Sequence, residues 1–211
     1  MAHAKLMDGV YARQRHIYDL TRKYYLLGRD RAISELTPPS GGHVLEIGCG
    51  TGRNLIIAAR QYPDVTFHGL DISSEMLSTA RSSIAKVGLS ERIRLACADA
   101  ARFDAGELFG RQTFDAVLMS YTLSMIPPWD QALQKGISVL SDNGKLVFVD
   151  FWDQSGLPGW SRLVLRKWLD LFHVAPREGL GEVAHDFAMQ HGRNCLFDPL
   201  YRGYACLGTI R

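Results

Sequence analysis

The stretch VLEIGCGTGRN, residues 44–54, constrains the fold of this chain more than any other. An apolar run leads into three glycines at alternate positions, and an amphipathic segment, RNLIIAARQY, begins before the stretch ends. Glycines let the backbone turn tightly and approach a ligand closely. The N-terminus of a following helix would direct free N–H groups and positive potential at that ligand. The pattern therefore predicts a strand, a ligand-binding loop and a helix, in that order.

Strand-like and helix-like patterns alternate along the rest of the chain. We expect strands in HVLEIG, VTFHGLD, RIRLACAD, TFDAVLMSY and KLVFVDF, separated by the helices RNLIIAARQY, SSEMLSTARSSIAKVG and WDQALQKGISVL and by the turn SDNG. Such repeated units indicate a parallel sheet with helices on both faces. The C-terminal segment reads as two strands around Asp198–Pro199. The predicted fold is α/β: a Rossmann-like doubly wound, mostly parallel sheet with a C-terminal antiparallel hairpin.

No internal repeat or low-complexity linker divides the 211 residues, so we predict one domain, 1–211. Apolar residues recur at three- and four-residue steps near the N-terminus, which is typical of a helix. We expect residues 1–40 to form an N-terminal helical segment. Residues 41–211 would form the core around the predicted sheet, with a helical insertion at 154–190.

The segment LEIGCGTG resembles motif I of the class I S-adenosylmethionine-dependent methyltransferases. GLDIS (69–73), ADA (98–100), FDAVLMSYTL and LSDNGKLVFVD resemble further family landmarks, in the family's order. The resemblance implies S-adenosylmethionine as cofactor and S-adenosylhomocysteine as product. It also implies that residues 1–40 form a helical lid over a cofactor-binding core, residues 41–211. It implies that Asp71 binds the ribose hydroxyls and that Asp99 and Ala100 bind the adenine. The expected cofactor-binding residues are Tyr18, Tyr25, Arg29, Glu46, Ile47, Gly48, Cys49, Gly50, Asn54, Asp71, Ile72, Met76, Asp99, Ala100, Ser120 and Tyr121.

A narrower resemblance lies in residues 11–33, YARQRHIYDLTRKYYLLGRDRAI, and in the ending LYRGYACLGTIR. Both are similar to bacterial betaine-lipid N-methyltransferases and, more weakly, to bacterial phospholipid N-methyltransferases. The resemblance implies stepwise methylation of the amine of diacylglyceryl-homoserine to the trimethyl betaine lipid. The alternatives are a phosphatidylethanolamine N-methyltransferase, a soluble small-molecule N- or O-methyltransferase, and a catalytically silent cofactor-binding module.

Charge and hydropathy favour a membrane surface as partner; the alternative for the basic N-terminal residues is a solvated helix face. Residues 1–31 hold seven basic and three acidic residues, while the whole chain has a net charge of only +2, so we expect no nucleic-acid partner. In residues 159–173, Trp160, Leu163, Val164, Trp168 and Phe172 share one helical face, which is typical of an interfacial helix or of a helix packed on the core. Without a signal peptide or a spanning segment, we expect a cytoplasmic protein at the inner face of the membrane. The sequence does not indicate the oligomeric state.

Methyl transfer to an amine needs a positioned neutral amine and leaves a bulkier cation. We expect Tyr18, Tyr121 and Asp150 to act in catalysis. Aromatic faces can hold such a cation, and the candidates are Tyr18, Tyr24, Tyr121 and Trp152. Asp150 and Asp153 follow or end a strand, where they could attract the cation, receive a proton, or only cap the strand. No spacing of cysteines or histidines indicates a metal site, and Cys49 is interpreted as a small spacer.

Overall fold

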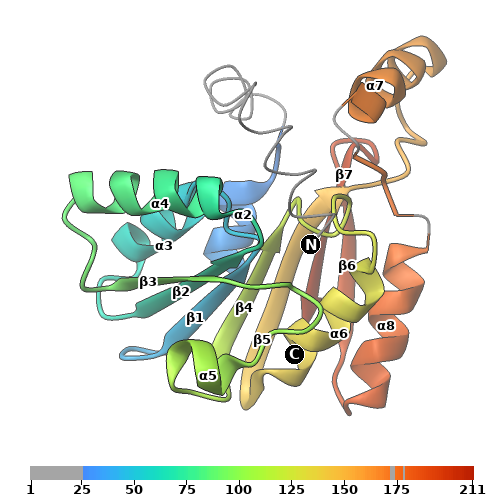
Figure 1. Ribbon diagram of the computed structural model, residues 1–211. Coiled ribbons are helices and arrows are strands. Elements are labelled where there is room, and N and C mark those ends of the chain that lie inside the picture. Colours follow the sequence, from blue (N-terminus) through green and yellow to red (C-terminus); the bar gives the residue numbers. More distant parts are fainter. Residues whose placement is uncertain (1–25, 172–173, 178) are drawn as a thin grey trace.

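The computed structural model describes residues 26–171, 174–177 and 179–211. Its centre is a seven-stranded sheet with the order β3-β2-β1-β4-β5-β7-β6 (Figure 1). The strands β1 to β5 run parallel, and β7 lies antiparallel between β5 and β6. The strands are β1 (His43–Ile47), β2 (Thr66–Asp71), β3 (Ile93–Cys97), β4 (Phe114–Ser120), β5 (Leu140–Phe151), β6 (Cys195–Leu200) and β7 (Ala205–Ile210). The predicted doubly wound sheet with an antiparallel C-terminal pair is confirmed.

Helices cover both faces of this sheet (Figure 1). One buried cluster unites the sheet with α2 (Arg29–Glu35), α3 (Arg53–Gln61) and α4 (Ser74–Lys86). The cluster on the other face includes α5 (Ala105–Phe109), α6 (Trp129–Ser138) and α8 (Leu180–Gln190). The remaining helix, α7 (Gly159–Leu171), projects from the body beyond one edge of the sheet. Within the described residues, no helix combines the length and the apolar character needed to cross a bilayer.

The strand order reverses between β1 and β4, which are neighbours in the sheet although β2 and β3 separate them in sequence. In open α/β sheets a ligand crevice forms at such a point, outside the carboxyl ends of the strands. The loops after β1, β2, β3 and β4 all leave the sheet at this edge. The topology therefore places the glycine loop and the later acidic motifs beside one another.

The hairpin turn differs from the prediction. Pro199 lies inside β6, opposite Cys206, and the turn follows at Tyr201, Arg202 and Gly203, which all have positive φ. Proline is tolerated in β6 because it is an edge strand, where a missing N–H breaks no ladder bond. The Asp198–Pro199 pair therefore looked like a turn but belongs to a strand.

The predicted SDNG turn is also wrong as a separate element. These residues lie within β5, where the pairing with β4 jumps from Phe114–Leu140 to Ala116–Lys145. The extra residues form an irregular bulge that lets β5 begin directly after α6. The short helix α5 has no counterpart among the predicted elements.

Parts of the predicted lid and insertion belong to the body. Ala32, Ile33 and Leu36 in and after α2 are fully buried, so residues 29–36 pack on the sheet rather than forming a separate lid. In the predicted insertion, α8 contacts α6 and the β6–β7 pair and completes the second helical layer. The first half of α7 stands out from the core, whereas Leu169 in its second half and Val174 after it are buried in the core. The rest of the predicted lid, residues 1–25, lies outside the described residues.

Candidate active site

A cavity of about 780 Å³ opens at the carboxyl edge of the parallel strands, within the size range of small-molecule sites. Apart from Ile47, every cofactor-binding residue predicted within the described ranges lines it. These residues are Arg29, Glu46, Gly48, Cys49, Gly50, Asn54, Asp71, Ile72, Met76, Asp99, Ala100, Ser120 and Tyr121. The Ile47 side chain is fully buried in the core, because it points to the side of β1 opposite to that of Glu46. The predicted Tyr18, Tyr24 and Tyr25 lie outside the described residues.

The glycine loop turns as the sequence predicts. Gly48, Gly50 and Gly52 all have positive φ, between 53° and 77°. The Gly48 N–H donates to the Leu70 carbonyl at 2.8 Å, which ties the loop to β2. A side chain at Gly48 would place its Cβ 2.6 Å from Cγ2 of Thr122, so the close packing of two loops requires glycine there.

Cys49 is interpreted as a spacer rather than a nucleophile. Its side chain is buried, and this burial raises the pKa of the thiol well above its ordinary value. The neighbouring carboxyls of Asp71 and Glu46 raise the pKa further. Since the thiolate is the reactive form, this cysteine is inert at neutral pH.

Asp71 ends β2 and connects two loops. Its Oδ2 accepts the Gly50 N–H at 2.8 Å, and its Oδ1 accepts the Ser73 N–H at 3.0 Å. A carboxylate offers about four acceptor positions to donors such as N–H and O–H groups. The side chain is held at the lip of the cavity and suits the paired hydroxyls of a ribose.

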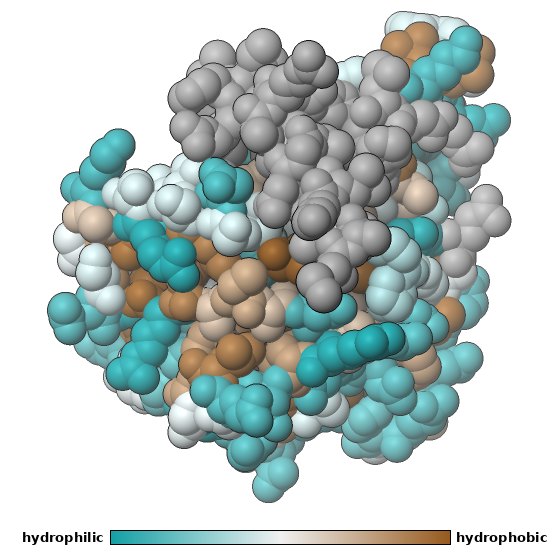
Figure 2. Space-filling model, viewed as in Figure 1, coloured by the Kyte–Doolittle hydropathy of each residue, from teal (hydrophilic) through white to brown (hydrophobic). Residues whose placement is uncertain are grey.

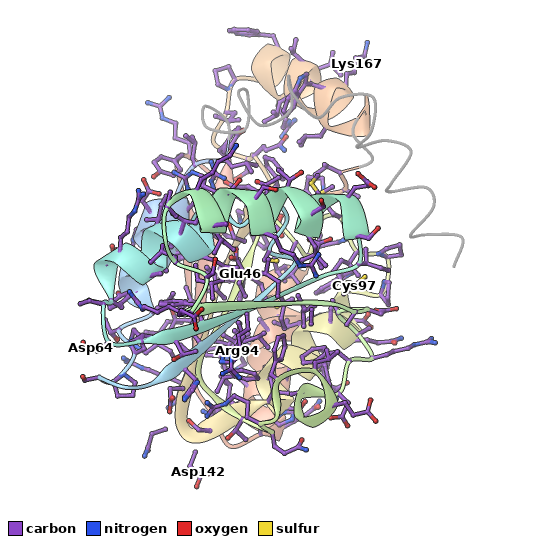
Figure 3. All side chains as sticks on the ribbon, turned by 60° about the vertical axis from the view of Figure 1, so that its left-hand side comes forward. Glu46, Asp64, Arg94, Cys97, Asp142 and Lys167 are labelled. Carbon is purple, nitrogen blue, oxygen red and sulfur yellow. The ribbon has the colours of Figure 1, made fainter. Side chains whose placement is uncertain are left out.

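Glu46 is the most perturbed acid of the cavity. It is 2% exposed and lies beneath α4 in the interior (Figure 3). Its Oε1 accepts from the Asn54 amide at 2.8 Å, whereas its buried Oε2 has no hydrogen-bond partner among the described residues. Burial raises the pKa of the carboxyl to about 8, although the Asn54 amide and the Arg29 charge act in the opposite direction. A buried acceptor without a partner in a cavity fits a cationic donor, such as the ammonium group of S-adenosylmethionine.

The loop after β3 suits an adenine. Asp99 is exposed, and its Oδ1 accepts the Ala101 N–H at 2.9 Å, which leaves its other oxygen for a donor such as an exocyclic amine. Ile72, Met76 and Ala100 supply apolar surface around it. The three loops therefore present groups for each part of an adenosine-containing cofactor.

The cavity continues into an apolar and aromatic region. Tyr121, Phe151 and Trp168 line it from the ends of β4 and β5 and from α7. The Tyr121 hydroxyl donates to the Leu27 carbonyl at 2.6 Å, and its ring meets Phe151 edge-on with centroids 4.7 Å apart. Burial raises the pKa of this phenol well above its ordinary value, so it stays protonated. Tyr121 also has a positive φ of 54°, a strained conformation of the kind that clusters at functional sites.

Two expectations about this region need correction. Trp152 does not line the cavity: its ring packs edge-on against Phe197, 4.7 Å away, on the other face of the sheet. Adjacent strand residues point to opposite faces, so Phe151 takes the position in the cavity instead. Phe151 could have been identified from the same strand end had the alternation been assigned correctly.

Asp150 is not among the cavity-lining residues either. It is 1% exposed and accepts the N–H groups of Ser124 at 3.1 Å and Phe151 at 2.8 Å. Burial raises the pKa of its carboxyl to about 6, and these hydrogen bonds limit the rise. Its position supports the alternative of a structural cap. Asp153 likewise accepts the Ser155 N–H at 2.9 Å in its own loop.

Arg177 is a site residue that sequence reasoning missed. Its guanidinium donates to the carbonyls of Leu123 at 3.0 Å and Ile126 at 2.8 Å, and more distantly to that of Ser124. Met125 and Ile126 of this loop line the cavity. Arg177 thus holds one wall in place from more than fifty residues away, and no local motif signals such a contact.

Comparisons with known proteins agree with this geometry. Residues 38–188 match the family model described as a methyltransferase domain. The phosphatidylethanolamine N-methyltransferase of Cereibacter sphaeroides is 33% identical over 110 residues, 52% of this chain and 51% of that protein. The ubiquinone/menaquinone biosynthesis C-methyltransferase UbiE of Bartonella henselae is 30% identical over 186 residues, 82% of this chain and 67% of that protein. The chain thus spans about half to two thirds of the length of these relatives.

Solved structures share the fold. A SAM-dependent methyltransferase from Aquifex aeolicus superposes with a TM-score of 0.66 at 18% identity, covering 94% of this chain and 96% of that one. The phosphoethanolamine N-methyltransferase 2 of Haemonchus contortus, in complex with S-adenosyl-L-methionine, has a TM-score of 0.66 at 20% identity, covering 82% and 38%. Because the family model spans well over half of the chain, including the glycine loop, this chain belongs to the family of S-adenosylmethionine-dependent methyltransferases.

Proposed function

We propose that this protein transfers the methyl group of S-adenosylmethionine to the amine of a membrane-lipid headgroup. One observation carries the proposal: the polar region suited to the cofactor opens directly into the region lined by Tyr121, Phe151 and Trp168. Among the described residues that line the cavity, the carboxyls are those of Glu46, Asp71 and Asp99, which belong to the cofactor region. An amine in the second region faces Tyr121, Phe151 and Trp168.

This surface suits each step of amine methylation. The cofactor supplies an electrophilic methyl group on its sulfonium, and the attacking amine must be neutral. Removal of an ammonium from water lowers its pKa, so an apolar wall favours the neutral form. Each transfer leaves a larger cation that forms fewer hydrogen bonds, and the faces of Tyr121, Phe151 and Trp168 can attract such a cation without a directional bond.

The finer proposal is stepwise methylation of diacylglyceryl-homoserine to the trimethyl betaine lipid. It rests on the resemblance of residues 11–33 and 200–211 to betaine-lipid N-methyltransferases. The relative named phosphatidylethanolamine N-methyltransferase supports an amine lipid but favours phosphatidylethanolamine as the alternative. A protein docked on the inner face of the membrane could bind the headgroup of either substrate.

The test is turnover with labelled S-adenosylmethionine on vesicles that contain diacylglyceryl-homoserine, phosphatidylethanolamine or no amine lipid. We expect mass spectrometry to find lipids with one, two and three added methyl groups on the first substrate. Methylation of phosphatidylethanolamine alone would replace the finer proposal. Turnover only on soluble amines would identify a small-molecule enzyme, and cofactor binding without turnover would identify a silent module.

A second candidate is C-methylation of a membrane quinone. Relatives named UbiE cover 82% of this chain, and others are named demethylmenaquinone methyltransferase, so the longest of these matches favour that chemistry. The same assay with demethylmenaquinol in the vesicles discriminates the two, because the label then appears on the quinone ring.

A further inference from the structure

We propose that the first half of α7 and the turn between β6 and β7 form one surface that docks on an anionic lipid bilayer at the mouth of the cavity. The inference rests on the proposed function, because it explains how a lipid headgroup reaches the cavity. We call this surface the docking face. It comprises Trp160, Arg162, Leu163 and Val164 from the first half of α7, Lys167 one turn later, and Tyr201 and Arg202 from the β6–β7 turn.

The apolar side chains of the docking face are largely exposed to solvent. Trp160, Leu163 and Val164 are exposed by 75%, 58% and 63%, and Tyr201 by 52%. Among the described residues, only two other large apolar side chains, Met189 and Leu196, are exposed by more than half. Exposed apolar groups are ordinary when scattered, whereas a cluster indicates an interaction site.

Backbone hydrogen bonds join the segment that precedes α7 to the β6–β7 turn. The Gln154 N–H donates to the Gly203 carbonyl at 2.8 Å, and the Gly156 N–H donates to the Arg202 carbonyl at 3.2 Å. The segment that leads into α7 is therefore fixed to the β6–β7 turn. Phe151 pairs with Ala205, so this turn lies at the carboxyl edge of β5, the edge at which the cavity opens. Figure 1 shows α7 projecting beyond that edge.

The charges around this apolar cluster are those that suit an anionic bilayer. The side chains of Arg162, Lys167 and Arg202 are exposed. The sequence of α7 holds three basic residues and one acidic residue. Figure 2 shows hydrophobic and hydrophilic side chains intermixed on the projecting helix. Tryptophan and tyrosine favour the membrane interface, and nearby cations are attracted to anionic headgroups.

The second half of α7 forms a wall of the cavity. Leu165 and Trp168 pack against the buried cluster of the body, and Leu169 is 1% exposed. Trp168 and Leu169 both line the cavity. Trp168 follows Trp160 and Val164 at four-residue steps, as the sequence predicted, so this apolar stripe runs from the exposed first half of α7 to the cavity. A helix that contacts lipid with its first half and the cavity with its second half places the headgroup plane beside the aromatic region.

The experiment compares two triple variants of the full chain. The docking variant carries Trp160→Ser, Leu163→Ser and Val164→Ser. The control variant carries Val87→Ser, Met189→Ser and Leu196→Ser, which removes three exposed apolar side chains from other surfaces. Co-sedimentation is measured with vesicles of phosphatidylcholine alone and of phosphatidylcholine mixed with phosphatidylglycerol. Calorimetry with S-adenosylhomocysteine shows whether each variant remains folded and binds the cofactor product.

We expect the docking variant to lose about tenfold or more of its partitioning to the anionic vesicles, while the control variant binds like the wild type. Both should bind S-adenosylhomocysteine normally. Arg162→Gln with Lys167→Gln should reduce the preference for anionic over neutral vesicles. Equal vesicle binding by the docking variant and the wild type would overturn the proposal, as would absence of vesicle binding by the wild type.

The outcome for the docking face is separable from that for the proposed function. Methylation of detergent-dispersed amine lipid by the docking variant, with loss of turnover on vesicles, would support both. Loss of vesicle binding by the docking variant without methylation of any amine lipid by the wild type would keep the docking face and reject the amine-lipid substrate.

Discussion

Replacement of Glu46 by glutamine tests the electrostatics of the cofactor region. Glutamine has nearly the same shape, and its carbonyl oxygen can accept the Asn54 amide that now donates to Oε1. At Oε2, which has no hydrogen-bond partner among the described residues, the change removes the ability to carry a negative charge and places an NH₂ group. We expect a more stable protein that binds its cofactor less tightly.

The stability gain follows from the pKa. Burial raises the pKa of Glu46 from 4.5 to about 8, so the folded chain binds a proton that the unfolded chain releases. The free energy of unfolding therefore falls as pH rises from 4.5 to about 8. At about 1.36 kcal/mol per pH unit, the interval from pH 4.5 to pH 7 costs about 3 kcal/mol. The glutamine variant should avoid this cost and gain up to that amount at pH 7, as measured by urea unfolding between pH 5 and pH 8.

The binding loss has the opposite pH dependence. The ammonium of the cofactor stabilises the charged carboxylate, so binding near pH 7 should release a proton from Glu46. At pH 8 the variant should lose about tenfold or more in affinity, the magnitude of a hydrogen bond to a charged group. At pH 6 the difference should shrink, because the wild type must first lose its proton.

Calorimetry with S-adenosylhomocysteine in two buffers of different ionisation enthalpy measures both the affinity and the released proton. Glu107→Gln, on the exposed surface of α5, is the control and should change neither quantity. The reasoning is refuted if Glu46→Gln leaves the affinity and its pH dependence unchanged, or if the variant is no more stable than the wild type at pH 7.

Three further variants test the structural roles of other residues. Asp71→Ala should remove the acceptor of the Gly50 N–H and the ribose contacts. Cofactor binding should weaken by about 1.5–3 kcal/mol per charged hydrogen bond, and an unchanged affinity for S-adenosylhomocysteine in calorimetry would contradict this. Gly48→Ala should lower the free energy of unfolding by more than about 1 kcal/mol in thermal unfolding. Gly41 has a similar φ but open space around it, so Gly41→Ala should lower the free energy of unfolding less. Arg177→Met should raise the KM for the methyl acceptor and leave S-adenosylhomocysteine affinity unchanged, because the loop that it holds lines the acceptor side; equal effects on both would assign it a general structural role.

The sequence by itself determined the cofactor half of this protein. Gly48, Asp71 and Asp99 each lie within a few residues of a strand end, and the parallel topology brings all such ends to one edge. The alternation of apolar strands and amphipathic helices was sufficient to predict that topology. Local pattern and final position agree here because each functional group is placed by the strand that directly precedes it.

Only the tertiary structure decided the acceptor half. The choice of Phe151 over Trp152 depended on the face to which each side chain points, which the pairing of β5 with β4 and β7 fixes. The assignment of Asp150 to a structural contact depended on the Ser124 N–H, which belongs to another loop. Arg177 reaches its carbonyls across more than fifty residues, and α7 divides its apolar side chains between the cavity and the surface. Such contacts join residues distant in sequence, and their energy depends on packing and burial that no local pattern contains.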